Sequence, residues 1–197
     1  TTEELVDNML KLTPNNHWQQ ANGNDVHLVI TGGEPLLGWQ RAYEELLSRP
    51  SMKDLRNITF ETNGTQKLSD EFKEYLEKWQ AKQWGREVTF SVSPKLSASG
   101  EAWEDAICPE IVASYEEVGT TYLKFVVETE AHFDEVDRAV KEYRAAGFAG
   151  KVYVMPQGGV VVPYDKNRVN VANWALERGY NYSPRLHVDL WGNGWGK

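Results

Sequence analysis

Residues 26–37 read VHLVITGGEPLL, and this stretch decides the fold of the chain. Residues 26–30 are a short apolar run with β-branched members, which is typical of a buried strand. The run passes into Thr31-Gly32-Gly33-Glu34-Pro35, where glycines let backbone N–H groups approach a ligand closely. Two glycines alone more often mark a plain turn. The full string, with Glu34 fixed at the strand end by Pro35, indicates a carboxylate placed to accept hydrogen bonds from an ammonium group.

Five further stretches repeat this strand pattern, and amphipathic stretches separate them. The expected strands are residues 26–30, 58–61, 88–92, 123–128, 151–155 and 185–190. The expected helices are residues 2–12, 39–49, 70–79, 133–143 and 167–178. Ser69 is the expected N-cap of the third helix, and Gly147 and Gly179 are expected to close the last two. Strands that alternate with helices predict a mainly parallel sheet, whereas residues 97–118 lack periodicity and predict a loop or a short irregular insertion.

The composition excludes several classes of protein. The chain has 197 residues, enough for one core, so we expect a single domain over residues 1–197. It has no apolar run of the roughly 20 residues that a bilayer requires and no signal-peptide pattern, so we expect a cytoplasmic protein that contacts no membrane. The net charge of −8 disfavours nucleic-acid partners. Cys108 is the one cysteine, which excludes an internal disulfide and any zinc or iron–sulfur site built from cysteines of this chain alone.

In parallel α/β folds, active sites collect where the chain leaves the carboxyl ends of the strands. After the second strand comes ETNGT at residues 61–65, in which Asn63-Gly64 is a standard turn pair. Glu61 is different, because a charged residue at the end of an apolar strand points either out to solvent or into the cleft. The third strand leads into SVSPK at residues 91–95, where Ser93 and Lys95 suit a carboxylate or a ribose. A surface lysine after a turn is the commoner case.

Two segments near the C-terminus also carry signals. MPQGG at residues 155–159 is typical of an exposed backbone edge on which a flat ring could hydrogen-bond, with Met155 against the face of the ring. The alternative is that Met155 belongs to the core and the glycines form a turn. The chain ends in RLHVDLWGNGWGK, which is rich in Trp and Gly, so we expect this end to be docked. His187 within it, taken alone, is more often a hydrogen-bonded strand histidine than a ligand.

Taken in order, the motifs TGGEPLL, ETNGT, SVSPKLS, VMPQGG and RLHVDLWGN resemble the radical S-adenosylmethionine (SAM) superfamily. Within it the chain is most similar, from Thr1 to Lys197, to the 7-carboxy-7-deazaguanine synthase family of queuosine and related deazapurine biosynthesis. GGEP belongs to the superfamily generally, whereas ETNGT together with SPK is much narrower. The resemblance implies an α/β fold: a partial (β/α)6 radical-SAM barrel with a mainly parallel sheet and outer helices.

The resemblance also implies a lyase reaction. In the family, a [4Fe–4S] cluster cleaves SAM to a 5′-deoxyadenosyl radical, which abstracts hydrogen from 6-carboxy-5,6,7,8-tetrahydropterin. The ring then contracts to 7-carboxy-7-deazaguanine with loss of ammonia, and Mg²⁺ assists. A flavodoxin-like external electron donor and a homodimer are expected as partners.

Site residues follow from the resemblance, position by position. The residues that it implies for SAM are Gly32, Gly33, Glu34, Ser93, Pro94, Lys95, Met155, Pro156, Gln157 and Gly158. The residues that it implies for the pterin are Thr31, Glu61, His187, Asn193 and Lys197. Glu61 is the candidate catalytic residue, because a carboxylate beside a bound ring exchanges protons when its pKa is suitable.

The chain departs from the family pattern near its start. The family's cluster ligands are three cysteines upstream of the GGEP strand, and no cysteine precedes Thr31. We therefore expect the first strand and the cluster loop to be absent through truncation. The strand at residues 26–30 is then expected to be an unpaired apolar edge. On this reading the chain holds no metal ligands and is inactive by itself.

Two alternatives stay open. One is another small radical SAM enzyme, such as a glycyl-radical activating enzyme, against which SPK and ETNGT argue; pterin binding by the complete protein would separate the two. The other is a cluster-free, non-catalytic descendant that binds a nucleoside or a protein partner, and it predicts a natural protein that begins near Thr1.

Overall fold

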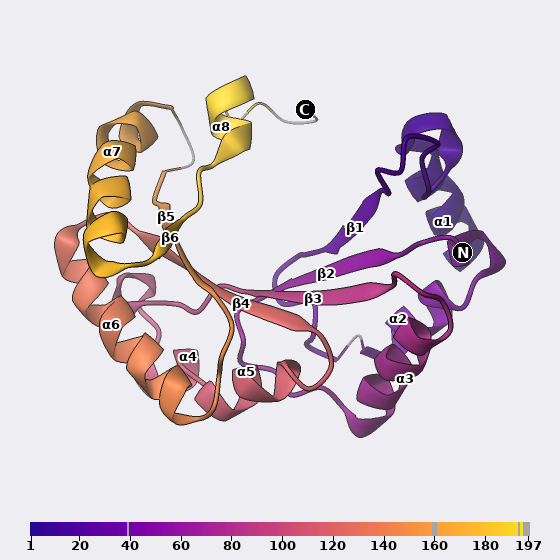
Figure 1. The fold of residues 1–197 in the computed structure, drawn as a ribbon, viewed down its shortest axis with the longest axis horizontal. Helices are drawn as coiled ribbons and strands as arrows, with labels where there is room; N and C mark the ends of the chain where they lie inside the picture. Colours follow the sequence, from indigo (N-terminus) through magenta and orange to yellow (C-terminus); the bar gives the residue numbers. More distant parts are fainter. Residues whose placement is uncertain (39, 159–160, 193, 195–197) are drawn as a thin grey trace. The chain divides into compact units, whose positions relative to one another are not determined.

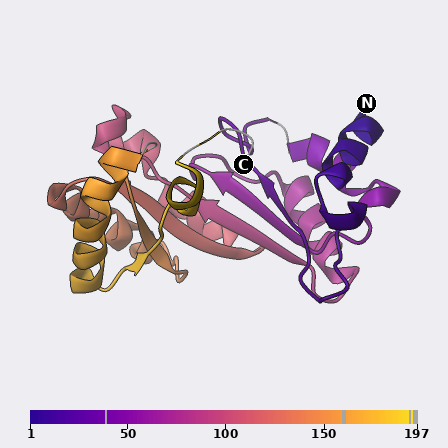
Figure 2. The same ribbon diagram turned by 90° about the horizontal axis from the view of Figure 1, so that it is seen from above.

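The computed structural model describes residues 1–38, 40–158, 161–192 and 194, shown as a ribbon in Figures 1 and 2. Its strands form one parallel sheet in the order β1-β2-β3-β4-β5-β6, and the sheet does not close. The strands are β1 (His27–Ile30), β2 (Asn57–Thr62), β3 (Glu87–Val92), β4 (Thr120–Val127), β5 (Val152–Pro156) and β6 (Asn181–Tyr182). Within this sheet β1 pairs with β2 alone. The expectation that the strand at residues 26–30 is an edge is therefore confirmed.

Helices connect successive strands, as parallel pairing requires. The α-helices are α1 (Thr2–Lys11), α2 (Gln40–Leu47), α3 (Asp70–Ala81), α4 (Trp103–Ala106), α5 (Pro109–Tyr115), α6 (Glu130–Ala145), α7 (Val161–Arg178) and α8 (Leu186–Trp191). Short 3₁₀ turns are η1 (Pro14–Asn16), η2 (Pro50–Met52) and η3 (Ser97–Ser99). None of the helices in the described ranges is both long enough and apolar enough to cross a membrane.

Two compact units make up the chain. Unit 1 is Thr1–Thr62, Gln66–Ser91 and Ser114–Thr120; unit 2 is Asn63–Thr65, Val92–Ala113 and Thr121–Lys197. The expectation of one domain stays a prediction.

An aromatic column forms the core of unit 1. Phe90 stacks on Tyr115 at 4.7 Å between ring centroids and on Phe60 at 5.7 Å, and Phe60 meets Phe72 edge to face at 5.9 Å. All four rings are fully buried. Because Phe60 and Phe90 alternate with more polar neighbours along β2 and β3, the column fixes which face of each strand turns to the helices.

Burial along the strands of unit 2 has a period of two. Leu123, Phe125 and Val127 of β4 are buried, and the residues between them are half-buried. α7 packs on β5 and β6 and also contacts α6. Each strand therefore turns one face to the helices and keeps the other partly open.

The predicted N-cap at Ser69 and the predicted glycines after two helices are confirmed. The Ser69 side chain caps α3 by accepting a 3.2 Å hydrogen bond from the Phe72 N–H. Gly147 and Gly179, with φ of +98° and +73°, take the left-handed conformation after α6 and α7.

Two predictions about secondary structure are wrong. Residues 185–190 form helix α8 rather than a strand, and the sixth strand lies earlier, at Asn181–Tyr182. The alternation of apolar and polar residues in LHVDL fits a strand, but contacts with α7 hold the segment as a helix. Residues 97–118 contain η3, α4 and α5 rather than a loop, since helices this short show little periodicity.

Candidate functional site

The loop after β1 leaves its backbone open to a ligand. Gly32 has φ of +153°, and a Cβ placed at Gly32 or at Gly33 would meet nothing within 4 Å. The backbone conformation accounts for glycine at Gly32, whereas neither conformation nor packing demands glycine at Gly33, where a ligand would have room for close approach. Thr31, which precedes them, is also exposed.

Glu34 is oriented by the neighbouring strand. Its Oε1 atom accepts hydrogen bonds of 2.7 Å from the Thr62 hydroxyl and 3.1 Å from the Leu36 N–H. The Tyr43 hydroxyl of α2 donates to the Pro35 carbonyl at 2.6 Å, and burial, followed by the Glu34 charge, raises the pKa of that phenol. The loop is thus anchored from β2 and from α2, which fixes the direction of the carboxylate.

Glu61 lies near the carboxyl end of β2, next to Thr62. It is half-buried, whereas Phe60 and Thr62 on either side are buried. Strand alternation therefore places Glu61 on the face of β2 opposite to the Phe60 ring.

In unit 2, several residues from the predicted motifs line one cavity of about 190 Å³. Its lining residues are Ser93, Pro94, Lys95, Leu96, Ala98, Ser99, Val126 and Gln157. Pro94 and Leu96 are buried, and Lys95 is exposed. A cavity with an apolar floor and an ammonium group at its edge can hold a ligand that is partly flat and partly anionic.

The second wall of this cavity follows β5. The Gln157 N–H donates a 2.7 Å hydrogen bond to the Val127 carbonyl at the end of β4, which extends the sheet by one residue. Gly158 has φ of +138°, and a Cβ there would approach the Tyr164 backbone nitrogen to 2.9 Å. This close packing on α7 requires glycine and fixes the path of the loop.

The structure brings together some of the predicted residues and not others. Ser93, Pro94, Lys95 and Gln157 share the cavity, as expected from strands that end side by side. Met155 and Pro156 belong to β5 beside it, with Met155 half-buried and Pro156 buried. His187 is exposed on α8, and Asn193 and Lys197 lie outside the described residues.

Sequence reasoning missed two functional contributions. Thr62 stands inside the ETNGT motif, but nothing in the sequence shows that its hydroxyl orients Glu34. Val126 lines the cavity of unit 2 from a half-buried position of β4, which the alternation of that strand could have indicated.

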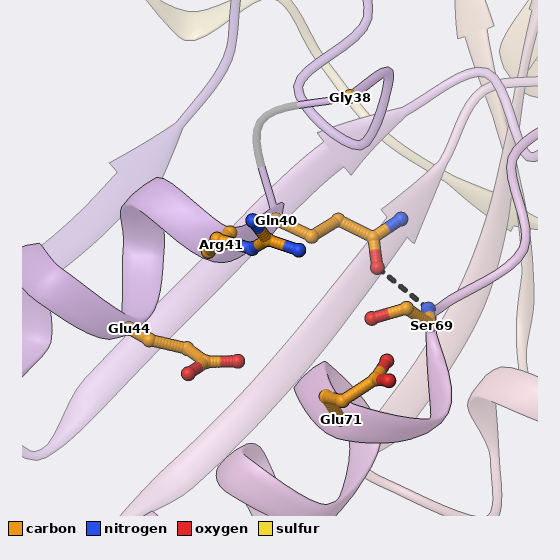
Figure 3. A pocket seen from close by; sticks show the side chains of 6 residues that line it. All are labelled: Gly38, Gln40, Arg41, Glu44, Ser69 and Glu71. Carbon is orange, nitrogen blue, oxygen red and sulfur yellow. Dashed lines mark hydrogen bonds between the residues drawn. The ribbon is translucent and has the colours of Figure 1, made fainter.

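A larger hollow of about 420 Å³ lies in unit 1, where α2 and α3 begin (Figure 3). Figure 3 shows Arg41, Glu44 and Glu71 projecting toward it. Gln40 joins its two sides: its amide accepts from the Ser69 N–H at 2.7 Å and donates to the carbonyls of Leu36 at 3.0 Å and Lys67 at 2.8 Å.

The described residues do not fit an iron–sulfur cluster. In those parts of the chain, no group of three or more His, Cys, Asp or Glu side chains is placed to hold a metal ion. Burial, followed by the charges of Asp105 and Glu110, raises the pKa of the Cys108 thiol, which opposes the thiolate form that metals bind.

In sequence, the chain is similar to three proteins named 7-carboxy-7-deazaguanine synthase. The Halobacterium salinarum protein is 33% identical over 84% of this chain, the Pyrobaculum aerophilum protein 29% over 87%, and the Rhodopirellula baltica protein 28% over 98%. The chain spans 65%, 68% and 69% of the lengths of these relatives, respectively. No family model matches the chain.

In structure, the chain is similar to Streptococcus suis SuiB, with TM-scores of 0.53 and, for SuiB bound to S-adenosylmethionine, 0.54. The matches cover 93% and 96% of this chain but 42% and 43% of SuiB, at 17% and 16% identity, so they bear on the fold alone. The predicted α/β fold of a partial, unclosed radical-SAM barrel is confirmed. Over most of its length, this chain is similar in sequence to proteins named 7-carboxy-7-deazaguanine synthase.

Proposed function

We propose that the protein containing this chain is a 7-carboxy-7-deazaguanine synthase. It would contract the ring of 6-carboxy-5,6,7,8-tetrahydropterin to 7-carboxy-7-deazaguanine, with ammonia as the leaving group. The observation that carries this proposal is the similarity to three proteins of that name, which extends over 84–98% of the chain.

SAM is the proposed cofactor. In unit 1, Glu34 would accept hydrogen bonds from the methionyl ammonium group, and the open backbone at Gly32 and Gly33 supports this assignment. In unit 2, Lys95 would pair with the methionyl carboxylate and Ser93 would bind the ribose, because both line one cavity. Gln157, on the same cavity, would offer its backbone carbonyl to the adenine ring, since its N–H is bonded to Val127.

The described residues do not hold every component that the proposed reaction requires. In the family that this chain resembles, the cluster is held by three cysteines upstream of the GGEP strand, and together with SAM it supplies a radical that abstracts hydrogen. Mg²⁺, an external electron donor and a homodimer are proposed for the whole protein on the same resemblance.

The residues proposed for the pterin are Thr31 and Glu61. Glu61 lies one residue before the end of β2, on the face opposite to Phe60, where a carboxylate can take up or release a proton of a bound ring. Its proposed role is to move a proton during ring contraction. His187, Asn193 and Lys197 are proposed as further pterin contacts from the resemblance alone.

The test uses the intact protein, reconstituted anaerobically with iron and sulfide and given SAM, Mg²⁺, a chemical reductant and the tetrahydropterin. We expect 7-carboxy-7-deazaguanine and ammonia in equal amounts, detected by mass spectrometry. Glu61→Gln should keep SAM affinity and lower kcat by a factor on the order of 100 or more. A reconstituted protein that cleaves SAM but leaves the pterin unchanged would exclude the synthase assignment.

A further inference from the structure

One face of α6 contacts the segment of residues 97–103, in which Ala98 and Ser99 line the cavity of unit 2. Glu135, Arg138 and Glu142 are spaced by three and four residues, so they share one side of the helix. Glu135 accepts two hydrogen bonds from Ser97: 2.9 Å from its N–H to Oε2 and 2.5 Å from its hydroxyl to Oε1. A single carboxylate thus satisfies both donors of Ser97.

The same face of α6 also contacts Trp103, at the C-terminal end of the segment of residues 97–103. The Trp103 Nε1–H lies 3.2 and 3.1 Å from the two carboxylate oxygens of Glu142. The Arg138 guanidinium lies 4.0 Å from the centre of the Trp103 ring and donates a 3.0 Å hydrogen bond to Glu142. α6 is therefore attached to the segment at two places about two helical turns apart.

The contact with Glu135 replaces a missing helix cap. η3 begins at Ser97, and its N-cap position is Leu96, whose side chain makes no capping hydrogen bond. The first N–H groups of a helix need an acceptor, and Leu cannot supply one. Glu135 supplies it from another element, so the position of η3 depends on α6.

This dependence reaches the cavity directly. Leu96, Ala98 and Ser99 flank Ser97 and line the cavity together with Ser93 and Lys95. Glu135 itself does not line it. A change at Glu135 would therefore alter the cavity through the loop and not through contact with a ligand.

We propose that Glu135 is a positioning residue for SAM: by holding Ser97, it fixes the loop of residues 93–99 in the conformation that presents Ser93 and Lys95 to the cofactor. This inference rests on the proposed function. Glu135 lies on α6, 38 positions away in sequence from Ser97, and α4, α5 and β4 lie between η3 and α6 in the chain.

The experiment measures SAM affinity by calorimetry and stability by urea unfolding, in the intact protein and its variants. Glu135→Ala and Ser97→Ala should each weaken SAM binding about tenfold, and the double variant should be no weaker than either single one. Glu135→Gln keeps one acceptor and should recover part of the affinity. Glu142→Gln is the matched control, because Glu142 lies on the same helix as Glu135 and contacts Trp103 instead of Ser97. This variant should leave SAM affinity within about twofold.

Lys95→Ala separates positioning from general stability. If Glu135 acts through the loop that carries Lys95, the effect of Glu135→Ala on SAM affinity should shrink in the Lys95→Ala background. An unchanged SAM affinity in folded Glu135→Ala protein overturns the positioning role alone. If the unsubstituted protein binds no SAM, the proposed function fails, and the positioning role fails with it.

Discussion

The hydroxyl of Thr62, at the end of β2, donates a 2.7 Å hydrogen bond to Oε1 of Glu34 in the loop after β1. Thr62 is 3% exposed, so water competes little for this contact. A carboxylate held by a neighbouring strand is pre-oriented for a ligand, so less conformational entropy is lost on binding.

Thr62→Val removes this hydrogen bond while nearly keeping the volume of the side chain. We expect a loss of about 1.5–3 kcal/mol in the free energy of unfolding, because a charged acceptor loses a buried donor. SAM affinity should fall as well, since Glu34 is then less well oriented. Urea unfolding and calorimetry measure the two effects; a stable variant with unaltered affinity would show that Thr62 does not orient Glu34 for the cofactor.

Gly64→Ala should be strongly destabilising. Gly64 has φ of +83°, and a Cβ there would lie 2.6 Å from Val92 Cγ1 and 2.9 Å from Val112 Cγ2. Strain and overlap together should cost about 2–4 kcal/mol. Gly100→Ala is the control, because Gly100 has φ of +81° with open space around its Cβ position. It should lose about 1 kcal/mol in urea unfolding, and equal losses at both sites would contradict the overlap.

Tyr164→Phe should loosen α8. The buried Tyr164 hydroxyl donates to Asp189 Oδ2 at 3.2 Å and accepts from the Arg185 N–H at 3.0 Å, at the start of α8. Arg168 still holds Asp189 at 3.0 Å, so we expect partial opening and not complete release. Hydrogen exchange at residues 186–192 should accelerate about tenfold in the variant. Unchanged exchange there would show that packing alone holds the helix.

Tyr180→Phe should make the protein less sensitive to alkali. Burial, followed by the hydrogen bond to Asp137, raises the pKa of Tyr180 above its ordinary value near 10. Its contribution to stability is present below pH 10 and is lost as the pH rises above 10, where the unfolded chain releases the proton first. The free energy of unfolding should therefore fall less between pH 9 and 11 in the variant than in the parent, and an identical slope would contradict this linkage.

Much of the fold was predictable because its strands are short apolar runs that adjoin recognisable turns. The predicted strand at residues 26–30 became β1, and the Ser69 cap lies where the sequence placed it. The segment at residues 185–190 failed for a physical reason: alternation suits a strand, but Tyr164 and Arg168, more than 15 residues away in sequence, hold Asp189 on a helix.

The candidate site was predictable only in its strand-end motifs. SPK follows β3 and Gln157 follows β5, on either side of β4, and they line one cavity because parallel strands end at the same edge of a sheet. Glu135 was not predictable, since it lies on an outer helix among other charged residues and its partner Ser97 is 38 positions away. Contacts of this kind depend on tertiary structure, so the local sequence pattern does not predict them.

The amide of Gln40 has a consequence for how unit 1 responds to change. It bonds to Leu36, which follows β1, and to Lys67 and Ser69, which follow β2. One side chain therefore couples the positions of two separate loops, so that a displacement of one loop strains the hydrogen bonds that hold the other. Mutations near the start of α3 would for this reason alter the position of the GGEP loop, although they change no residue of that loop.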